Sequence, residues 1–175
     1  DAAAAATALA QMRGLKGRGQ RHTVFVPGGS FVLIDESYNA SPVSVIAAIE
    51  VLGLCQVSEG GRRIAVLGDM LELGDESERL HIALAEKLVA GHIDLVFTAG
   101  QYTAALAEAL PRKMRGSHTS MTQKLAPIVT AAVRPGDVVM VKGSLGSRTG
   151  LIVEALLGLG CDMDEDDTRC AVNGE

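Results

Sequence analysis

Four short segments of this 175-residue chain are candidates to bind small charged molecules, and three of the four are unusually polar. Each follows a short apolar, β-rich segment, which is the arrangement expected at the end of a strand. The segments are 35–40 (DESYNA), 68–74 (GDMLELG), 99–101 (AGQ) and 142–147 (KGSLGS). In an open parallel sheet, ligands bind outside the carboxyl ends of the strands. The spacing therefore predicts that these segments meet at one ligand-binding edge.

The first segment offers two neighbouring acids, Asp35 and Glu36. A carboxylate at a strand end can accept both hydroxyls of a ribose, which is a common use of this position in nucleotide-binding folds. The alternative is a pair of solvated carboxylates near the start of a helix. The sequence does not choose between the two acids.

The other segments are equally open to two interpretations. Backbone N–H groups and the ammonium of Lys142-Gly143-Ser144 could hold an anion, or the segment could be an ordinary β–α turn. It is not a P-loop, because GxxxxGK[ST] occurs nowhere in the chain. Asp69 and Glu72 could bind a cation, or could favour the start of a helix near residue 75 through its dipole.

Alternating β and α patterns must position these segments. Helical spacing after Ser41-Pro42, a typical helix start, predicts a helix that ends near Gly53. The remaining patterns predict strands at 23–26, 31–34, 64–67, 95–98, 117–119 and 138–141, and helices at 75–90, 102–110, 121–133 and 151–157. Strands that are apolar along their full length are covered on both faces. We therefore expect an α/β fold: a doubly wound, mostly parallel, Rossmann-like sheet with helices on both faces and a small N-terminal hairpin.

The composition of the chain argues against three classes of partner: nucleic acids, membranes and metal ions. The net charge is −5 and the 16 Lys and Arg residues are dispersed, so nucleic acid is not an expected partner. No apolar run approaches the roughly 20 residues that a membrane helix needs, so no membrane association is expected. Three distant cysteines and four scattered histidines form no metal-ligand spacing, which predicts reduced thiols, no metal site and a cytoplasmic location.

Three of the polar segments resemble signatures of one enzyme family. Residues 34–42 (IDESYNASP) resemble the D-[DE]-S-Y-N-A-N-P segment of the C-terminal domain of Mur ligases that add D-alanyl-D-alanine to UDP-N-acetylmuramoyl-tripeptide. Residues 63–74, with His81 after them, resemble the GDM-x-ELG…H segment, and 141–144 resemble the VKGS turn. Sister Mur ligases typically carry His where Asn39 stands. The three signatures occur in the family's order and cover about residues 15–158.

The resemblance implies an ATP- and Mg²⁺-dependent amide ligase. In this family ATP phosphorylates the terminal carboxylate of the UDP-linked tripeptide, and the amine of D-alanyl-D-alanine displaces the phosphate. The phosphate loop and the Mg²⁺ ligands belong to a central domain, against which the C-terminal domain closes. We therefore expect 1–15 to be the last helix of that central domain, 16–22 a linker, 23–160 the C-terminal domain and 161–175 a flexible acidic tail. The chain alone is expected to be an inactive monomer.

Site residues follow from matching positions in the family motifs. Arg18 matches an interdomain arginine that reaches the nucleotide, with Arg21 as the fallback. The expected nucleotide-binding residues are Arg18, Asp35 or Glu36, Tyr38 and Asn39, and the expected substrate-binding residues are Asp69, Glu72, Lys142, Ser144 and Arg148. Many family members have Arg where Leu145 stands, and Arg148 is the candidate replacement.

Two alternatives to the D-alanyl-D-alanine ligase remain at this point. One is a sister enzyme, either another Mur ligase or a folylpolyglutamate-type ligase. A ligase that adds meso-diaminopimelate would be expected to carry a DNPR loop, and the chain has none. The other alternative is a non-catalytic nucleotide- or anion-binding module with the same fold.

Overall fold

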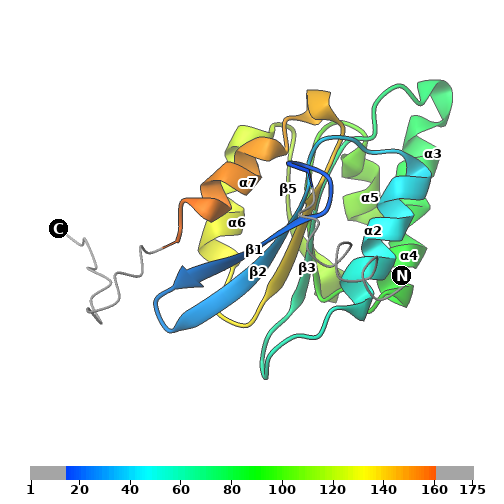
Figure 1. Ribbon diagram of the computed structural model, residues 1–175. Helices are drawn as coiled ribbons and strands as arrows, with labels where there is room; N and C mark the ends of the chain where they lie inside the picture. The colour runs from blue at the N-terminus through cyan, green and yellow to red at the C-terminus, as the bar shows by residue number, and fades with distance from the viewer. Residues whose placement is uncertain (1–14, 161–175) are drawn as a thin grey trace, which may run out of the picture.

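The computed structural model describes residues 15–160. Almost all of the expected central-domain helix (residues 1–14) and the expected acidic tail (161–175) lie outside the described residues. The described part is a six-stranded sheet with helices on both faces, as predicted (Figure 1). Within it, no helix is long and apolar enough to cross a membrane.

The N-terminal hairpin is larger than expected. Strands β1 (Gln20–Val26) and β2 (Gly29–Glu36) pair antiparallel from Gln20↔Asp35 to Val26↔Gly29. Pro27-Gly28 makes the turn, with Gly28 at φ 86°, where a residue without Cβ is favoured. Residues 20–22, expected in a linker, therefore belong to β1, because their backbone groups pair with the end of β2.

The hairpin is part of the main sheet rather than an appendage. The strand order is β1-β2-β6-β3-β4-β5, and β2 pairs in parallel with β6 (Val138–Lys142). Strands β3 (Arg63–Gly68), β4 (Leu95–Ala99) and β5 (Arg115–Thr119) complete the parallel part. The C-terminal ends of these five parallel strands lie at one edge, so the polar segments that follow them lie on the same side of the molecule.

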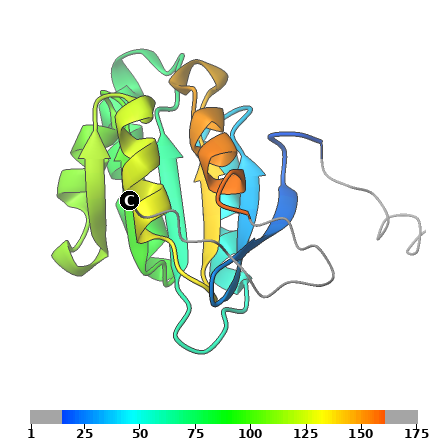
Figure 2. The same cartoon turned by 90° about the vertical axis from the view of Figure 1, so that its left-hand side faces the viewer.

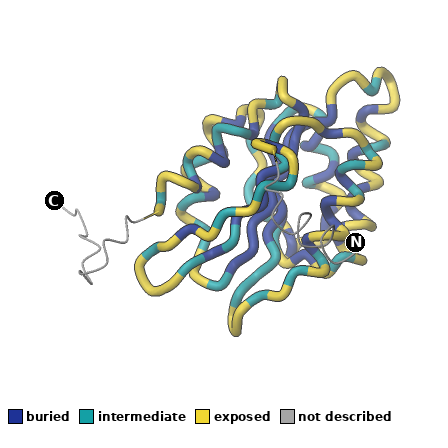
Figure 3. The backbone as a smooth tube through the Cα atoms, in the orientation of Figure 1, coloured by how far each residue is buried: buried dark blue, intermediate teal, exposed yellow. Residues whose placement is uncertain are grey.

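Helices cover the sheet in two layers (Figures 1 and 2). Helices α2 (Pro42–Leu54), α3 (Ser77–Ile82), α4 (Leu84–Ala90) and α5 (Thr103–Ala109) lie on one face. Helices α6 (Thr122–Ala132) and α7 (Gly150–Leu157) lie on the other. Alternate residues of each central strand contribute to two separate apolar cores, one per face. Figure 3 shows the resulting buried sheet between half-exposed helices.

The start of α2 confirms the predicted helix signal. Ser41 is the N-cap and Pro42 the first helical residue. The Ser41 hydroxyl accepts a hydrogen bond from the Ser44 N–H at 3.3 Å, and the Ser44 hydroxyl accepts one from the Ser41 N–H at 2.9 Å. This reciprocal capping box gives a hydrogen-bond acceptor to two backbone N–H groups at the start of the helix, those of Ser41 and Ser44.

The single helix predicted for 75–90 is wrong in detail. The segment begins with the 3₁₀ turn η1 (Gly74–Glu76) and continues as α3 and α4, which are separated at Ala83. Ala83 itself keeps helical angles (φ −60°, ψ −21°), so the break is a local tightening without a change of direction. Within α3, the buried imidazole of His81 accepts a hydrogen bond at 2.9 Å from the N–H of Met70, which lies in the segment after β3. His81 therefore holds the segment after β3 against α3.

An ion pair between the partly exposed Arg62 and the buried Asp137 lies at the opposite edge of the sheet. Asp137, just before β6, is 1% exposed and accepts hydrogen bonds from the Arg62 N–H and its guanidinium and from the Arg134 N–H. The hydrogen bond to Asp137 raises the pKa of Arg62 above its ordinary value, while partial burial opposes that shift. The pair thus holds together the N-terminal ends of β3 and β6, at the end of the sheet opposite the predicted ligand edge.

Candidate functional site

The predicted ligand edge contains two cavities, separated by the turn after β6. Its parts are the 15–19 loop, the segments after β2, β3, β4 and β5, and the 3₁₀ turn η3 (Leu145–Ser147), which leads into α7. The polar segments predicted from spacing do meet here. Their side chains divide into buried groups that hold the edge together and exposed groups that are free to contact a ligand.

The 15–19 loop presents Arg18 to solvent above Tyr38. Gly17 and Gly19 flank Arg18 with φ of 75° and 79°, a conformation that residues with a Cβ rarely adopt. A Cβ at Gly17 would also lie 2.8 Å from the Tyr38 Cβ. The Arg18 guanidinium lies 4.5 Å from the Tyr38 ring centroid, a cation–π contact. The GRG sequence therefore allows a turn tight enough to stack Arg18 on Tyr38.

Asp35 has a structural role in this arrangement. It is 1% exposed, and its carboxylate accepts hydrogen bonds from the Gly17 N–H (2.9 Å), the Ser37 N–H (3.0 Å) and the Ser37 hydroxyl (2.6 Å). Three donors occupy both oxygens, so Asp35 fixes the 15–19 loop against the end of β2. Of the two acids that the sequence left open, Asp35 is thus the one that is not available to a ribose.

Glu36 is the partly exposed acid of the pair. Its Oε2 atom lies 3.3 Å from the Lys142 ammonium, which also donates to the Asn39 carbonyl at 3.0 Å. Glu36 and Lys142 are register partners on neighbouring parallel strands, so their side chains leave the sheet side by side. Lys142 was expected to contact substrate, but it is 2% exposed and its contacts are with the segment after β2.

Ser144 and Asp69 likewise connect segments of the edge. The Ser144 hydroxyl accepts from the Leu71 N–H at 3.0 Å and donates to the Ala40 carbonyl at 3.3 Å. The Asp69 carboxylate accepts from three successive N–H groups, those of residues 101, 102 and 103, at 2.9, 3.1 and 2.9 Å. Asp69 therefore caps the start of α5, and its expected contact with substrate is limited to the edge that it exposes to the second cavity.

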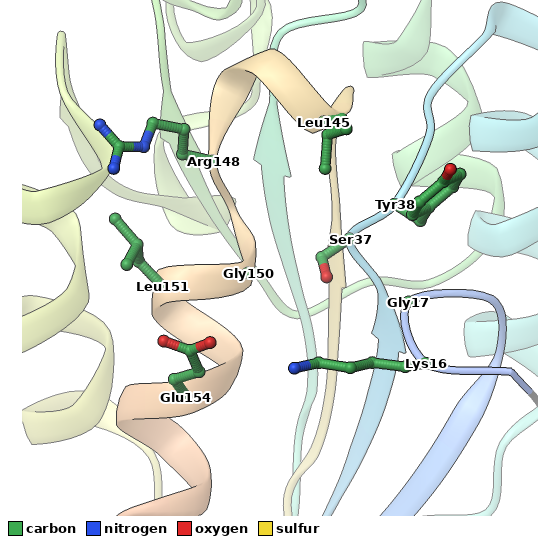
Figure 4. A pocket seen from close by; sticks show the side chains of 9 residues that line it. All are labelled: Lys16, Gly17, Ser37, Tyr38, Leu145, Arg148, Gly150, Leu151 and Glu154. Carbon is green, nitrogen blue, oxygen red and sulfur yellow. The ribbon is translucent and has the colours of Figure 1, made fainter.

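The first cavity lies between the 15–19 loop and α7 and has a volume of about 470 Å³. In Figure 4, Lys16 extends from the loop toward α7, where Glu154 lies on the facing side. Its lining is mixed, with aliphatic and aromatic surface beside both charges: Lys16, Gly17, Ser37, Tyr38, Leu145, Arg148, Gly150, Leu151 and Glu154. Such a lining suits a ligand with both a flat apolar part and polar groups.

The second cavity lies across the turn after β6 and measures about 340 Å³. It is lined mainly by small and polar residues at the ends of β3, β4, β5 and β6, including Gln101, Ser120 and Ser147. Arg148 lines both cavities. Its backbone is left-handed (φ 57°), and its side chain extends toward α6 in Figure 4. This cavity therefore offers a cation among hydrogen-bonding groups, a setting for a small carboxylate.

The remaining expected site residues are dispersed. Asn39 is exposed, and its side-chain oxygen accepts from the Ala40 N–H at 2.8 Å. Glu72 is exposed with φ 66° and lines neither cavity. Arg21, the fallback for Arg18, points to the α2 side, where its guanidinium lies 3.8 Å from the Cys55 sulfur.

Sequence reasoning missed several lining residues. Lys16, Leu151 and Glu154 carry no motif, and Glu154 lies on a helix whose position relative to the loop depends on the fold. Ser37 and Gln101 were within the polar segments but carried no assigned role. The strand-end rule, by which ligands bind at the carboxyl ends of parallel strands, could have found those two, because Ser37 directly follows β2 and Gln101 lies two residues after β4.

Mg²⁺ is the ion that the resemblance implies, and the described residues do not offer it a site. Among residues 15–160, no group of three or more His, Cys, Asp and Glu side chains is arranged to hold a metal ion. The buried carboxylates of Asp35 and Asp69 are already occupied by N–H and O–H donors. That the Mg²⁺ ligands belong to a central domain stays a prediction.

Comparison with known proteins identifies the family. Residues 17–145 match the model of the Mur ligase, glutamate ligase domain. The chain belongs to the Mur ligase family. It is 36% identical over 150 residues to the UDP-N-acetylmuramoyl-tripeptide–D-alanyl-D-alanine ligase of Bacillus subtilis, covering 83% of this chain and 32% of that protein. It is 34% identical over 129 residues to the Escherichia coli enzyme of the same name, covering 71% of this chain and 26% of that protein.

Solved Mur ligase structures share the fold. A crystal structure of MurF from Acinetobacter baumannii superposes with a TM-score of 0.72 at 26% identity, covering 87% of this chain and 33% of that one. The MurF ligase of Thermotoga maritima, solved in complex with ADP, gives a TM-score of 0.66 at 28% identity over 86% of this chain and 33% of that one. The chain thus spans about a third of the length of the relatives that it matches, and it corresponds to their Mur ligase C-terminal domain.

Proposed function

We propose that this chain is the C-terminal domain of an ATP-dependent ligase that adds D-alanyl-D-alanine to UDP-N-acetylmuramoyl-tripeptide in peptidoglycan synthesis. The observation that carries the proposal is the two-sided ligand edge. It presents an arginine, an aromatic ring and a partly exposed acid on one side, and a cation-lined cavity on the other. The names of the relatives in Bacillus subtilis and Escherichia coli support the same reaction.

The nucleotide side is formed by Arg18, Glu36 and Tyr38. Glu36 has a partly exposed carboxylate at a strand end, the position from which an acid accepts ribose hydroxyls. Arg18 lies over Tyr38 at 4.5 Å and is exposed, so its charge can approach the phosphates while the ring flanks the nucleoside. Asp35 acts indirectly, by holding the loop that carries Arg18.

The acceptor side is formed by the second cavity and Arg148. D-Alanyl-D-alanine is a small zwitterion with one carboxylate, and a guanidinium can bind a carboxylate through two parallel hydrogen bonds. Arg148 takes this role in the proposal, with Gln101 and Ser120 as hydrogen-bonding neighbours. Leu145, which stands where many family members have arginine, lines the first cavity and leaves Arg148 as the cation of this turn.

The chemistry requires two steps. The tripeptide carboxylate takes the γ-phosphoryl group of ATP and becomes an acyl phosphate, with release of ADP. The dipeptide amine then attacks the acyl carbon, loses a proton and expels phosphate, which leaves an amide. In the proposal this chain supplies positioning: it holds nucleoside and dipeptide, and it closes on the rest of the enzyme to exclude water. No step is assigned to a metal ion held by these residues, and the chain alone is expected to be inactive.

ADP release by the full-length protein that contains this chain tests the proposal. The substrate is UDP-N-acetylmuramoyl-tripeptide, with and without D-alanyl-D-alanine. ADP release that depends on the dipeptide is the expected result. Release supported by a different amino acid would assign the chain to a sister ligase, and no release with any acceptor would contradict ligase function.

A further inference from the structure

Lys142 is an unusual residue for the centre of a sheet. It ends β6, the strand between β2 and β3, and is 2% exposed. Lysine is almost never fully buried unless its charge is paired, because removing an ammonium from water is costly. Two contacts compensate this charge: the Glu36 carboxylate at 3.3 Å and the Asn39 carbonyl at 3.0 Å. Both belong to the end of β2 and the segment after it, 103 to 106 residues earlier in the chain.

The contact with Glu36 uses only one carboxylate oxygen. Lys142 approaches Oε2, whereas Oε1 lies toward Gly19 of the 15–19 loop, where a Cβ on residue 19 would be 3.3 Å away. Oε1 accepts no hydrogen bond from the described residues. The carboxylate is therefore held from its buried side by a fixed ammonium, and its other oxygen faces the loop that carries Arg18.

We infer that Lys142 is a positioning residue for nucleotide binding: it orients Glu36 so that the free carboxylate oxygen accepts the ribose hydroxyls of ATP. This assignment rests on the proposed function and replaces the expectation that Lys142 contacts the dipeptide. The reason is geometric, because the buried ammonium makes both of its contacts with the segment that contains Glu36, Tyr38 and Asn39. A free glutamate side chain would have to lose rotamer freedom on binding ribose, whereas one held by Lys142 is already ordered.

The test compares ATP with 2′,3′-dideoxy-ATP, which has no ribose hydroxyls. In the full-length enzyme, Lys142→Met removes the ammonium and keeps most of the aliphatic stem. We expect the KM for ATP to rise about tenfold, the KM for the dideoxy nucleotide to change less than about twofold, and the KM for D-alanyl-D-alanine to stay within about twofold. The preference for ATP over the dideoxy nucleotide should therefore fall. Lys113→Met, at an exposed lysine on the opposite edge of the sheet, is the matched control and should leave all three constants unchanged.

Two further variants keep the test decisive if Lys142→Met folds poorly. Lys142→Gln keeps a donor for the Asn39 carbonyl and loses the charge, and Glu36→Gln keeps the shape of the acceptor and loses the carboxylate. Both should show the same loss of preference for ribose hydroxyls. A raised KM for the dipeptide with an unchanged nucleotide preference would overturn the inference and make Lys142 a substrate contact. A lower Tm with all constants unchanged would make Lys142 purely structural and would overturn it as well.

Failure of the proposed function gives a different result. In that case the wild-type enzyme would show no dipeptide-dependent ADP release. Calorimetric binding of ATP and 2′,3′-dideoxy-ATP to the same variants would still measure the nucleotide preference. Loss of that preference in Lys142→Met supports the positioning role, and an unchanged preference overturns it, whichever acceptor the enzyme uses.

Discussion

Replacing Asp69 by alanine should destabilise this domain more than any ordinary surface change. The Asp69 carboxylate is 6% exposed and accepts hydrogen bonds from the backbone N–H groups of Gln101, Tyr102 and Thr103 at 2.9–3.1 Å. Alanine would leave these three donors at the start of α5 without an acceptor. Gly100 allows the approach, because a Cβ there would lie within 2.6 Å of the carboxylate atoms.

The expected size of the effect follows from these contacts. A hydrogen bond to a charged group contributes about 1.5–3 kcal/mol, and loss of a helix N-cap alone costs about 1 kcal/mol. The three bonds share one carboxylate and are not additive, and water can enter from the second cavity, which Asp69 lines. We therefore expect Asp69→Ala to lower the free energy of unfolding by about 3–4 kcal/mol, and Tm by about 10 °C for a domain of this size.

Urea unfolding of the 175-residue chain, followed by circular dichroism, measures this directly. Asp75→Ala is the matched control: Asp75 is an exposed aspartate in η1, and its loss should change the free energy of unfolding by less than about 0.5 kcal/mol. Asp69→Asn keeps one acceptor oxygen, so its loss of unfolding free energy should lie between those of Asp69→Ala and Asp75→Ala. If the unfolding free energy of Asp69→Ala were within about 1 kcal/mol of that of the Asp75→Ala control, the capping role of Asp69 would be refuted.

Two further substitutions test other parts of the structure. Asp137→Ala removes the buried partner of Arg62 and should cost about 3 kcal/mol, measured as a shift of the urea midpoint at constant m. Because the hydrogen bond to Asp137 raises the pKa of Arg62, the stabilisation is complete below the ordinary arginine pKa and is lost only as pH rises through the higher folded-state pKa. Titration of Arg62 should therefore leave the difference in unfolding free energy between wild type and Asp137→Ala unchanged until strongly alkaline pH. A loss of this Arg62-dependent stabilisation near neutral pH would contradict the assignment. Ser41→Ala removes the N-cap of α2 and should cost about 1 kcal/mol, whereas Ser41→Asn should be nearly neutral; equal losses in both would show that the hydroxyl is not acting as a cap.

The sequence predicted the layers of the fold because its signals are local. Apolar strands such as 64–67 and 138–141 indicate burial on both faces, and Ser41-Pro42 marks a helix start through the side-chain oxygen and ring that a first turn needs. The division of 75–90 into two helices had no such signal. Ala83 favours a helix, and the break is a matter of hydrogen-bond geometry within one turn.

The candidate site was predicted as a set of segments, with less success for individual side chains. The strand-end rule correctly brought the segments after β2, β3, β4 and β6 to one edge. It could not separate Asp35 from Glu36, because both directly precede the same loop. Burial separates them: three donors surround the Asp35 carboxylate, whereas Glu36 keeps one oxygen without a partner among the described residues.

By itself, then, the sequence determined the class of fold, the edge of the sheet where the polar segments meet and, through its motifs, the family. Only the tertiary structure decided which polar residues hold that edge together and which are free. The physical reason is strand order: β6, near the end of the chain, lies between β2 and β3. This places Lys142 beside Glu36 and Ser144 between the segments after β2 and β3, and no local pattern encodes contacts between residues more than 70 positions apart.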